Sequence, residues 1–310
     1  MPQAWTTRDI PAQTGRLALV TGAGGLGFET ALALAQAGAE VIVAGRNEEK
    51  GQAAVRDILQ RAPRRANVRF EPLDLASMAS IAACAARLNA AGQPLDLLIN
   101  NAGVMTPPTR QTTADGFELQ FGTNYLGHFA LTGRLMPLLE NAPAARVVNL
   151  SSLAHRSGQI HFDDLQSLRS YSPWRAYGQS KLAMLMFAFE LQRRAEANSW
   201  PVISNAAHPG YARTDLIANG PGERGVLWQI NRAMQPFVSH SAAEGALPTL
   251  FAATSPDAHG GEYFGPNGFY ELKGPPRRAH VAAQAKDAEV AAKLWKVSCE
   301  LTSTSWPKGK

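Results

Sequence analysis

The sequence predicts a single α/β domain built on a doubly wound parallel sheet of about seven strands flanked by helices. Two observations predict it. Short, continuously apolar runs recur along the chain, and most are followed by a longer segment with apolar residues three and four positions apart. Such runs are typical of parallel strands covered by helices on both faces. No Gly/Ser-rich linker divides the 310 residues, so one domain over 1–310 is expected.

The elements follow in order along the chain. We assign strands to Leu17–Val20, Val41–Ala44, Val68–Phe70, Leu95–Ile99, Val147–Leu150 and Val202–Ala206. Helices are assigned to Leu26–Ala37, Glu48–Arg61, Ser77–Asn89, Ala114–Glu140 and Arg175–Ala197. Ala154–Trp174 and about 212–240 look like insertions after strand ends, where ligands bind in open α/β sheets. The second insertion is interpreted as an apolar substrate lid, and about 278–310 as a C-terminal surface extension with a helix.

Composition excludes several classes of function. Charged residues make up 18% of the chain and the net charge of +5 is spread out, which argues against a nucleic-acid surface. The two cysteines, Cys84 and Cys299, lie in no metal-binding spacing, so no metal is expected. Residues 1–10 lack the apolar core of a secretory signal, and the apolar run Leu182–Phe189 is too short to span a bilayer. A soluble, cytoplasmic protein without a membrane partner is expected.

A glycine-rich turn follows the first predicted strand. Gly22, Gly24 and Gly27 form GxGxxG between that strand and a helix, with Gly25 and Leu26 inside the motif. Glycines let the backbone approach a pyrophosphate, which the amides at the helix N-terminus bind. The turn therefore predicts a dinucleotide site in a Rossmann fold, rather than a merely flexible loop.

The end of the second strand predicts which dinucleotide binds. NAD-binding folds usually carry an acidic residue there, whereas this chain has Arg46 followed by Asn47. A guanidinium can bind the 2′-phosphate of NADP(H) bidentately. NADP(H) is the expected cofactor; the alternative is that Arg46 is a solvated charge after a strand.

From about Arg16 to Phe264 the chain resembles the short-chain dehydrogenase/reductase family. The resemblance rests on the glycine turn, Asp74-Leu75, Asn100-Asn101-Ala102-Gly103, Asn124, Ser151-Ser152, Tyr177-Gly178-Gln179-Ser180-Lys181 and Pro209-Gly210. Two segments, Gly22–Ala31 and Ser151–His155, look most like the branch with the retinol dehydrogenases and protochlorophyllide reductases. The resemblance implies further cofactor contacts: Asp74 with Leu75 and Asn101, Ala102 and Gly103 on the adenosine side, and Pro209, Gly210, Tyr211 and Thr214 around the nicotinamide. An Asp74 that caps the next helix is the alternative.

The resemblance also implies the catalytic residues. A carbonyl that accepts hydride needs a proton donor and a second hydrogen-bond donor, roles that Tyr177 and Ser152 would fill. Lys181, on the same helix face as Tyr177, is expected to lower the phenol pKa from about 10 and to reach the nicotinamide ribose. Asn124 would complete a water-linked proton relay, or else be a structural residue in a kinked helix. Ser151 is the alternative to Ser152.

Two departures from the family pattern stand out. The glycine turn is one residue shorter than the family's usual turn, which leaves the pyrophosphate geometry open. Ser152 lies 25 residues before Tyr177, a longer spacing than is common in the family but one that the retinol dehydrogenase branch shares. His128, His155 and His208 have no partner at metal-ligand spacing and are interpreted as core or supporting residues.

The predicted function is the NADP(H)-dependent interconversion of a carbonyl and an alcohol, of the carbonyl reductase or alcohol dehydrogenase type. The apolar residues of the predicted lid favour a hydrophobic ketone, aldehyde or secondary alcohol. Two alternatives stay open: a catalytically silent NADP(H)-binding sensor or scaffold, and a reductase of an activated C=C bond. Family members commonly pair through the helices assigned to Ala114–Glu140 and Arg175–Ala197. Because Ala154–Trp174 can obstruct that contact, a homodimer or a monomer is expected.

Overall fold

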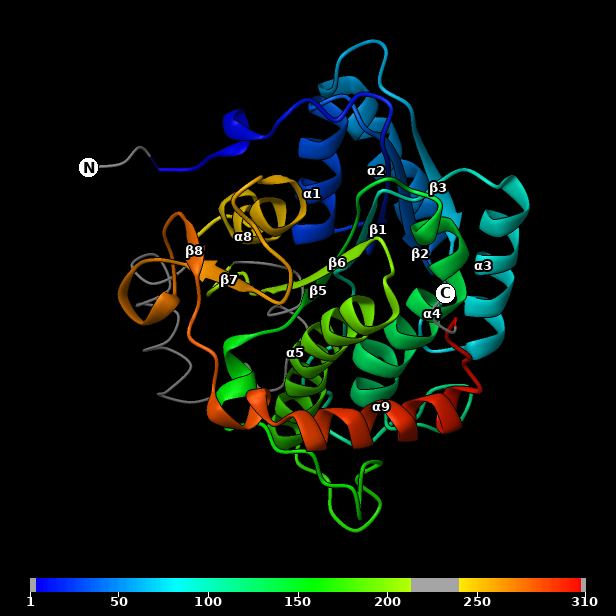
Figure 1. Ribbon diagram of the computed structural model, residues 1–310, viewed down its shortest axis with the longest axis vertical. Coiled ribbons are helices and arrows are strands. Elements are labelled where there is room, and N and C mark those ends of the chain that lie inside the picture. Colours follow the sequence, from blue (N-terminus) through cyan, green and yellow to red (C-terminus); the bar gives the residue numbers. More distant parts are fainter. Residues whose placement is uncertain (1–3, 213–239, 308–310) are drawn as a thin grey trace.

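The computed structural model of the chain describes residues 4–212 and 240–307. Its centre is one sheet of eight strands in the order β3-β2-β1-β4-β5-β6-β7-β8 (Figure 1). The strands are β1 (Leu17–Thr21), β2 (Glu40–Gly45), β3 (Val68–Pro72), β4 (Leu97–Asn100), β5 (Ala145–Leu150), β6 (Val202–Ala207), β7 (Tyr263–Pro266) and β8 (Pro276–Arg278). The first seven are parallel, and β8 is antiparallel to β7. The doubly wound α/β fold expected from the sequence is confirmed.

The strand order reverses at β1. The chain builds β2 and β3 outward on one side of β1 and then crosses to β4 on the other side. In open α/β sheets the crevice at such a reversal, beyond the carboxyl ends of the strands, is where ligands bind. The glycine turn after β1 and the segment after β4 are therefore brought to one place.

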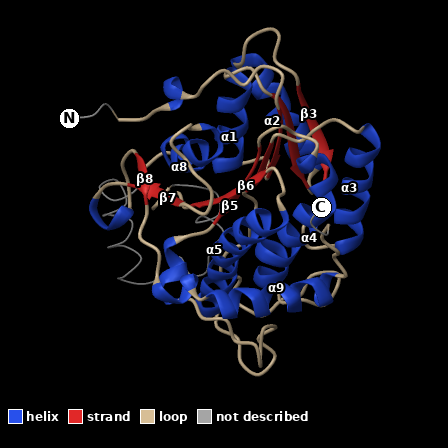
Figure 2. Ribbon diagram, viewed as in Figure 1, coloured by secondary structure: helices blue, strands red, loops and turns tan. Residues whose placement is uncertain are grey.

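Helices cover both faces of the sheet (Figures 1 and 2). They are α1 (Gly25–Gln36), α2 (Glu48–Arg61), α3 (Met78–Ala91), α4 (Gly127–Glu140), α5 (Pro173–Asn198), α8 (Ala242–Thr254) and α9 (Ala288–Thr302). Strand residues alternate between two cores: Leu17 and Leu19 face the core with α3, α4 and α5, whereas Ala18 and Val20 face that with α1, α2 and α8. Burial on both faces explains why the strands read as continuous apolar runs.

Several boundaries differ from the sequence-based expectations. The helix expected over Ala114–Glu140 begins only at Leu119, because Thr112 and Glu118 form an antiparallel bridge around Gly116, whose φ is +84°. A π-helical turn, Phe121–Leu126, then precedes α4. Leu95 lies outside β4, since its amide donates to Leu138 O. α8, β7 and β8 were not assigned from the sequence.

Short 3₁₀ turns complete the description: η1 (Thr7–Asp9), η3 (Leu153–Ser157), η4 (Phe269–Glu271) and η5 (Ala283–Lys286). The 3₁₀ turn η3 opens the predicted insertion Ala154–Trp174. Further along, this insertion is anchored by Gln179 Nε2, which donates to Leu165 O. The predicted lid at about 212–240 lies outside the described residues, except for its ends.

The C-terminal segment packs against the body of the fold. α9 lies across the outer side of α4 and α5 (Figure 1), and its buried face includes Leu294 and Trp295. Trp295 and Trp306 both contact Phe129 of α4, with ring centroids 5.0 and 5.2 Å apart. The region expected to be a surface extension thus contributes one side of a helix to the core.

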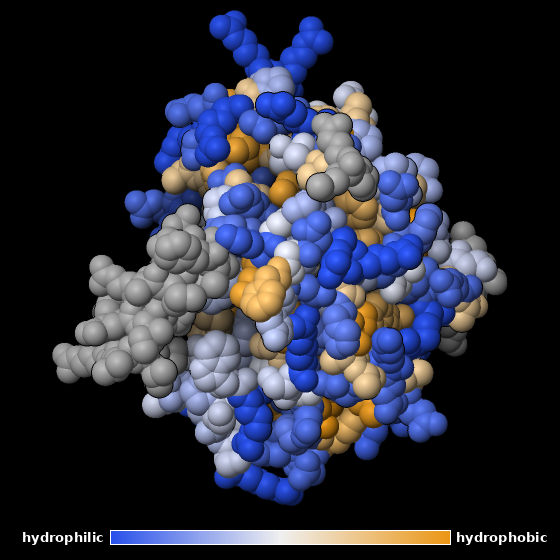
Figure 3. Space-filling model, turned by 90° about the vertical axis from the view of Figure 1, so that its left-hand side faces the viewer, coloured by the Kyte–Doolittle hydropathy of each residue, from blue (hydrophilic) through white to orange (hydrophobic). Residues whose placement is uncertain are grey.

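The described surface on the α8 and β8 side is largely polar, with scattered apolar side chains (Figure 3). Within residues 4–212 and 240–307, no helix has the length and apolar character needed to cross a membrane.

Candidate active site

The glycine turn connects β1 to α1 by a close backbone approach. Gly22 has φ +95°, and a Cβ at Gly27 would lie 2.1 Å from Gly22 O. Gly24 caps α1 without a side-chain hydrogen bond. The first amides of a helix lack intrahelical acceptors, so this end of α1 can bind an anion through its backbone.

The Thr21 hydroxyl joins the glycine turn to the segment after β4. Its oxygen accepts from the Asn101 and Ala102 amides at 2.9 and 3.0 Å. His128 Nδ1 lies 2.8 Å from Asn124 O, which can only accept, so Nδ1 carries the hydrogen and Nε2 accepts from Thr21 at 2.9 Å. Burial lowers the pKa of His128 to about 4, which keeps the ring neutral. Thr21 thereby fixes the backbone of two predicted cofactor residues.

The predicted adenosine-side residues have different surroundings. Arg46 is exposed at the end of β2, while the Asn47 side chain caps α2 by accepting from Lys50 N at 2.8 Å. Asp74 Oδ1 accepts from Ala76 N, and the residue that caps α3 is Ser77 rather than Asp74.

Two further residues assigned to the cofactor site face inward. The Leu75 side chain is buried in the core beside α3 and α4, so it offers no side-chain surface to a ligand. Asn101 Nδ2 donates to Thr21 O, and its amide side chain therefore holds the turn together.

Asn124 lies in the π-helical turn and is fully buried. Its Oδ1 accepts from Val104 N at 2.7 Å, and its Nδ2 donates to Val104 O and to Ser180 Oγ, each at 3.0 Å. A Cβ at Gly103 would lie 3.0 Å from Asn124 Oδ1 and 3.7 Å from Lys181 Nζ. Asn124 thus occupies a widened helical turn, as a structural residue in a kinked helix would, and it also lies beside Lys181, as a proton relay would require. π-turns often occur at functional sites.

Tyr177 and Lys181 are buried one turn apart on α5. Lys181 Nζ lies 5.8 Å from the Tyr177 ring centroid and donates to Leu150 O at 3.0 Å. Burial raises the pKa of Tyr177 to about 12, although hydrogen bonding with Ser152 acts in the other direction. Burial lowers the pKa of Lys181 to about 8. The lowering of the phenol pKa expected from Lys181 stays a prediction, because burial and the Ser152 hydrogen bond are the causes that act on Tyr177 here.

Ser151 and Ser152, which follow β5, make different hydrogen bonds. Ser151 is buried, and its hydroxyl donates to Lys181 O at 2.7 Å, which anchors α5 to the strand end. Ser152 caps η3, where its Oγ accepts from Ala154 N at 3.2 Å. An accepting Oγ still has its own hydrogen to donate, so the geometry favours Ser152 over Ser151 as the second donor.

The segment after β6 is held by backbone contacts. Gly210 has φ +67°, and a Cβ there would lie 2.3 Å from Leu272 O. Tyr211 N donates to Leu272 O at 2.8 Å, and His240 Nε2 donates to Pro209 O at 2.6 Å. Thr214, expected to hold the nicotinamide carboxamide, lies outside the described residues.

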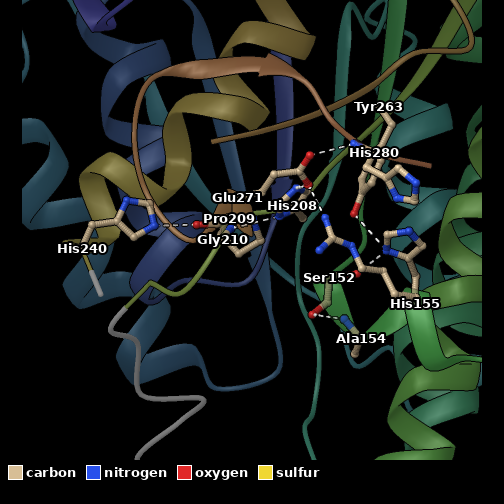
Figure 4. Close-up of polar contacts among 11 residues, drawn as sticks. Ser152, Ala154, His155, His208, Pro209, Gly210, His240, Tyr263, Glu271 and His280 are labelled. Carbon is tan, nitrogen blue, oxygen red and sulfur yellow. Dashed lines mark hydrogen bonds and ion pairs between the residues drawn. The ribbon is translucent and has the colours of Figure 1, made fainter. Parts of the chain in front are cut away.

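A buried polar cluster lies between this segment and Ser152 (Figure 4). Glu271 Oε2 lies 2.6 Å from Arg156 Nη2 and 3.2 Å from His208 Nε2, and its Oε1 accepts from His280 N at 2.8 Å. Burial would raise the pKa of Glu271, but His208, the His280 amide and Arg156 outweigh it and lower the pKa to about 2. Glu271 is a site neighbour that sequence analysis missed, because no local pattern marks it.

No group of three His, Cys, Asp or Glu side chains in the described part of the chain is arranged to hold a metal ion. The histidines singled out from the sequence each contact neighbouring protein groups: His128 contacts Thr21, His155 Nδ1 donates to Ser152 O at 2.7 Å, and His208 contacts Glu271.

Comparison with known proteins places this site in a family. A family model described as short chain dehydrogenase matches residues 16–223. The chain belongs to the short-chain dehydrogenase/reductase family. It is therefore an oxidoreductase of the kind that uses a nicotinamide dinucleotide.

Its curated relatives belong to the retinol dehydrogenase branch. This dehydrogenase/reductase is 40% identical to a polyprenol dehydrogenase of Danio rerio, over 94% of its own length and 88% of that protein. It is 41% identical to retinol dehydrogenase 13 of Homo sapiens, over 94% and 86% of the two chains, and 40% identical to human retinol dehydrogenase 12, over 94% and 88%.

Solved structures share the fold. A crystal structure of an uncharacterized protein from Mycobacterium paratuberculosis superimposes with a TM-score of 0.80 at 40% identity, covering 98% of this chain and 100% of that one. The NADP complex of Pseudomonas aeruginosa RhlG gives a TM-score of 0.64 at 25% identity, covering 81% and 94%.

The residues of this dehydrogenase/reductase fit a dinucleotide. The absence of side chains at Gly22 and Gly27 lets the turn pack closely on itself and on Asn101, and the start of α1, which no side chain caps, presents its first backbone amides there. Asn101 Oδ1 is buried with no hydrogen-bond partner among the described residues, so a polar group that approaches the turn would find an acceptor there. The shortened glycine turn thus keeps the features that a pyrophosphate needs.

Proposed function

We propose that this dehydrogenase/reductase uses NADP(H) to interconvert an apolar alcohol and its aldehyde or ketone. The observation that carries the proposal is that Tyr177 and Lys181 meet Ser152 and Leu150 O at the carboxyl end of β5, while Asn124 holds Val104 in the segment after β4. Bound nicotinamide would supply or accept the hydride. The protein residues would bind the dinucleotide, orient the carbonyl and exchange its proton.

Tyr177 is the proposed acid and base. Because its pKa is raised to about 12, the phenol is protonated at neutral pH and can give its proton to a carbonyl oxygen that gains negative charge. Ser152, which is hydrogen-bonded with Tyr177, would be the second donor to that oxygen. Lys181 is mostly an ammonium below its pKa of about 8 and would stabilise the phenolate that remains.

The preference for NADP(H) rests on Arg46. It is exposed at the end of β2, and no acidic residue lies within Val43–Asn47 to repel a 2′-phosphate. Titration with NADPH and NADH by fluorescence should give at least ~10-fold tighter binding of NADPH, about 1.4 kcal/mol. Arg46→Asp should remove that preference, whereas Arg56→Asp, an equal charge change at an exposed position of α2, should keep it. Equal affinities in the wild type would contradict the proposal.

An apolar substrate is favoured by Trp174. This side chain is 62% exposed, and its ring meets that of Tyr177 edge-on with centroids 6.1 Å apart. An exposed indole beside a catalytic phenol offers an apolar surface to a substrate. The relatives named for retinol and polyprenol, both apolar alcohols, support the same class.

The reaction is tested with NADPH and a series of aldehydes and ketones of increasing apolar length, following the nicotinamide absorbance. Tyr177→Phe should lower kcat at least ~100-fold with little change in NADPH affinity. Tyr125→Phe is the matched control, since this buried hydroxyl contacts Ser298 away from the site at 2.7 Å. NADPH binding without turnover would support a sensor, and turnover restricted to activated C=C bonds would support the other reductase chemistry.

We also propose that the protein is a monomer. α9 covers the outer side of α4 and α5, the helices expected to pair two copies, with Trp295 and Trp306 packed on Phe129. Sedimentation at micromolar concentration should give the mass of one chain, and a dimer would contradict this proposal.

A further inference from the structure

We propose that Glu271 is a positioning residue that sets the hydrogen position on His208 and ties the Pro209-Gly210 segment to the turn that carries Ser152. The proposal rests on the proposed function, in which the first segment contacts nicotinamide and Ser152 contacts the carbonyl oxygen. It gives a role to a carboxylate that the oxidoreductase chemistry itself does not use.

The Glu271 carboxylate links three segments that are distant in sequence (Figure 4). Arg156, in η3 four residues after Ser152, reaches Oε2 at 2.6 Å. His208, directly before Pro209, lies 3.2 Å from the same oxygen. The His280 amide donates to Oε1 at 2.8 Å. Since Glu271 is only 6% exposed, water cannot easily replace these partners.

The contacts of His208 determine its tautomer. Gly210 N donates to His208 Nδ1 at 3.2 Å, so Nδ1 must be the bare nitrogen and Nε2 must carry the hydrogen. Nε2 lies 3.2 Å from Glu271 Oε2, outside hydrogen-bond geometry, so the carboxylate acts on this hydrogen through its negative charge. A hydrogen on Nδ1 would instead oppose the Gly210 amide. Glu271 therefore stabilises the one neutral form of His208 that can hold the Gly210 backbone.

Tyr263 provides a second connection between the two segments. Its ring lies against His155, with centroids 5.3 Å apart, and against His208, at 5.2 Å. His155 Nδ1 in turn donates to Ser152 O at 2.7 Å. A shift of the His208 ring would thus be transmitted toward Ser152 as well as toward Gly210.

The backbone that presents Glu271 is unusual. Tyr270 and Glu271 have φ of +49° and +61°, in the left-handed region that glycine favours. Two consecutive side-chain-bearing residues in this region persist only where surrounding contacts hold them. The carboxylate contacts hold this turn together with backbone hydrogen bonds from Glu271 N to Gly268 O and from Leu272 N to Phe269 O.

The test compares Glu271→Gln with Glu190→Gln. Glu190 is the matched control: it is 5% exposed and also contacts two arginines, Arg193 and Arg194, each at 2.7 Å, but it lies nine residues beyond Lys181 on α5. We expect Glu271→Gln to lower kcat at least ~10-fold with NADPH affinity within ~3-fold, whereas Glu190→Gln should leave both unchanged. Arg156→Gln, which alters a one-third exposed side chain, should show the same kcat loss and replaces Glu271→Gln if that variant does not fold.

A second readout needs neither turnover nor cofactor. In ¹⁵N-histidine-labelled protein, His208 should show the Nε2–H tautomer in the wild type and a mixture of tautomers in Glu271→Gln. Arg156→Gln leaves the carboxylate beside His208 and should keep the wild-type tautomer. An unchanged tautomer in Glu271→Gln, or kcat within ~2-fold in both variants, would overturn the positioning role. A role in stability alone would lower the melting temperature without either change. If wild-type protein reduces no carbonyl, the proposed function fails, and the tautomer measurement still decides the role of Glu271.

Discussion

The Thr21 hydroxyl offers a sharp test of how the cofactor turn is held. Thr21→Val keeps the shape of the side chain but removes an oxygen that accepts from the Asn101 and Ala102 amides at 2.9 and 3.0 Å and donates to His128 at 2.9 Å. Ala102 N and His128 Nε2 would lose their partner, whereas the Asn101 amide keeps a second acceptor, Ile99 O, at 3.0 Å. At about 1 kcal/mol for each of the two, the low end for an unpaired group, the free energy of unfolding should fall by about 2 kcal/mol.

Urea unfolding monitored by circular dichroism measures this loss, and a thermal scan should show a decrease of about 4–8 °C if each kcal/mol costs about 2–4 °C. NADPH affinity should also weaken, because the Asn101 and Ala102 amides lose their anchor. Thr30→Val is the matched control: Thr30 is fully buried on α1, and its hydroxyl has no hydrogen-bond partner among the described residues. It should unfold within about 0.5 kcal/mol of the wild type. Equal stabilities of the two variants would refute this account of the turn.

Three further predictions follow from the geometry. Gly27→Ala should abolish measurable NADPH binding, since its Cβ would lie 2.1 Å from a carbonyl oxygen of the same turn. Gly92→Ala should lower only the stability, because Gly92 has φ +67° but open space around it. Isothermal titration with NADPH compares the two variants. Ser77→Ala should lower the free energy of unfolding by about 1 kcal/mol without changing NADPH affinity, because Ser77 caps α3. Asp74→Asn should weaken NADPH binding without changing the free energy of unfolding, and tight NADPH binding by this variant would remove Asp74 from the cofactor site. The pKa of Glu271 is about 2, below the ordinary value of 4.5, so this carboxylate contributes stability above pH 4.5 that is lost as the pH falls toward 2. The difference in unfolding free energy between wild type and Glu271→Gln should therefore shrink by up to ~3 kcal/mol over that range. A difference that does not depend on pH in acid unfolding would contradict this prediction.

Much of the fold could be predicted because its signals are local. The strands are apolar runs buried on two faces, and Tyr177 and Lys181 are placed together by the helical repeat itself. The glycine turn was equally predictable, since the close approach at Gly27 excludes every side chain. Each of these constraints acts within a few residues.

The remaining features depend on contacts between distant residues. Thr21 and His128 are 107 positions apart, and Arg156 and Glu271 are 115 apart, so no spacing in the sequence connects them. The sequence gives the lysine one turn from Tyr177 but not the burial that raises the pKa of the phenol. α9 has an amphipathic pattern that indicates a helix, but not that its apolar side packs on α4 and α5.

The π-helical turn Phe121–Leu126 contains one extra residue, which affects how the helix before it is aligned with α4. A turn of i to i+5 hydrogen bonds contains one residue more than the α-helical turn it replaces. Deleting one residue from the stretch before Asn124 would let a regular helix run into α4 without disturbing its apolar face. If the same residues formed an α-helix without a deletion, the residues before the turn would instead be rotated by about 100° around the axis relative to α4. The extra residue thus acts as a rotational offset: it lets α4 keep its packing register while Asn124 points toward Val104 and Ser180.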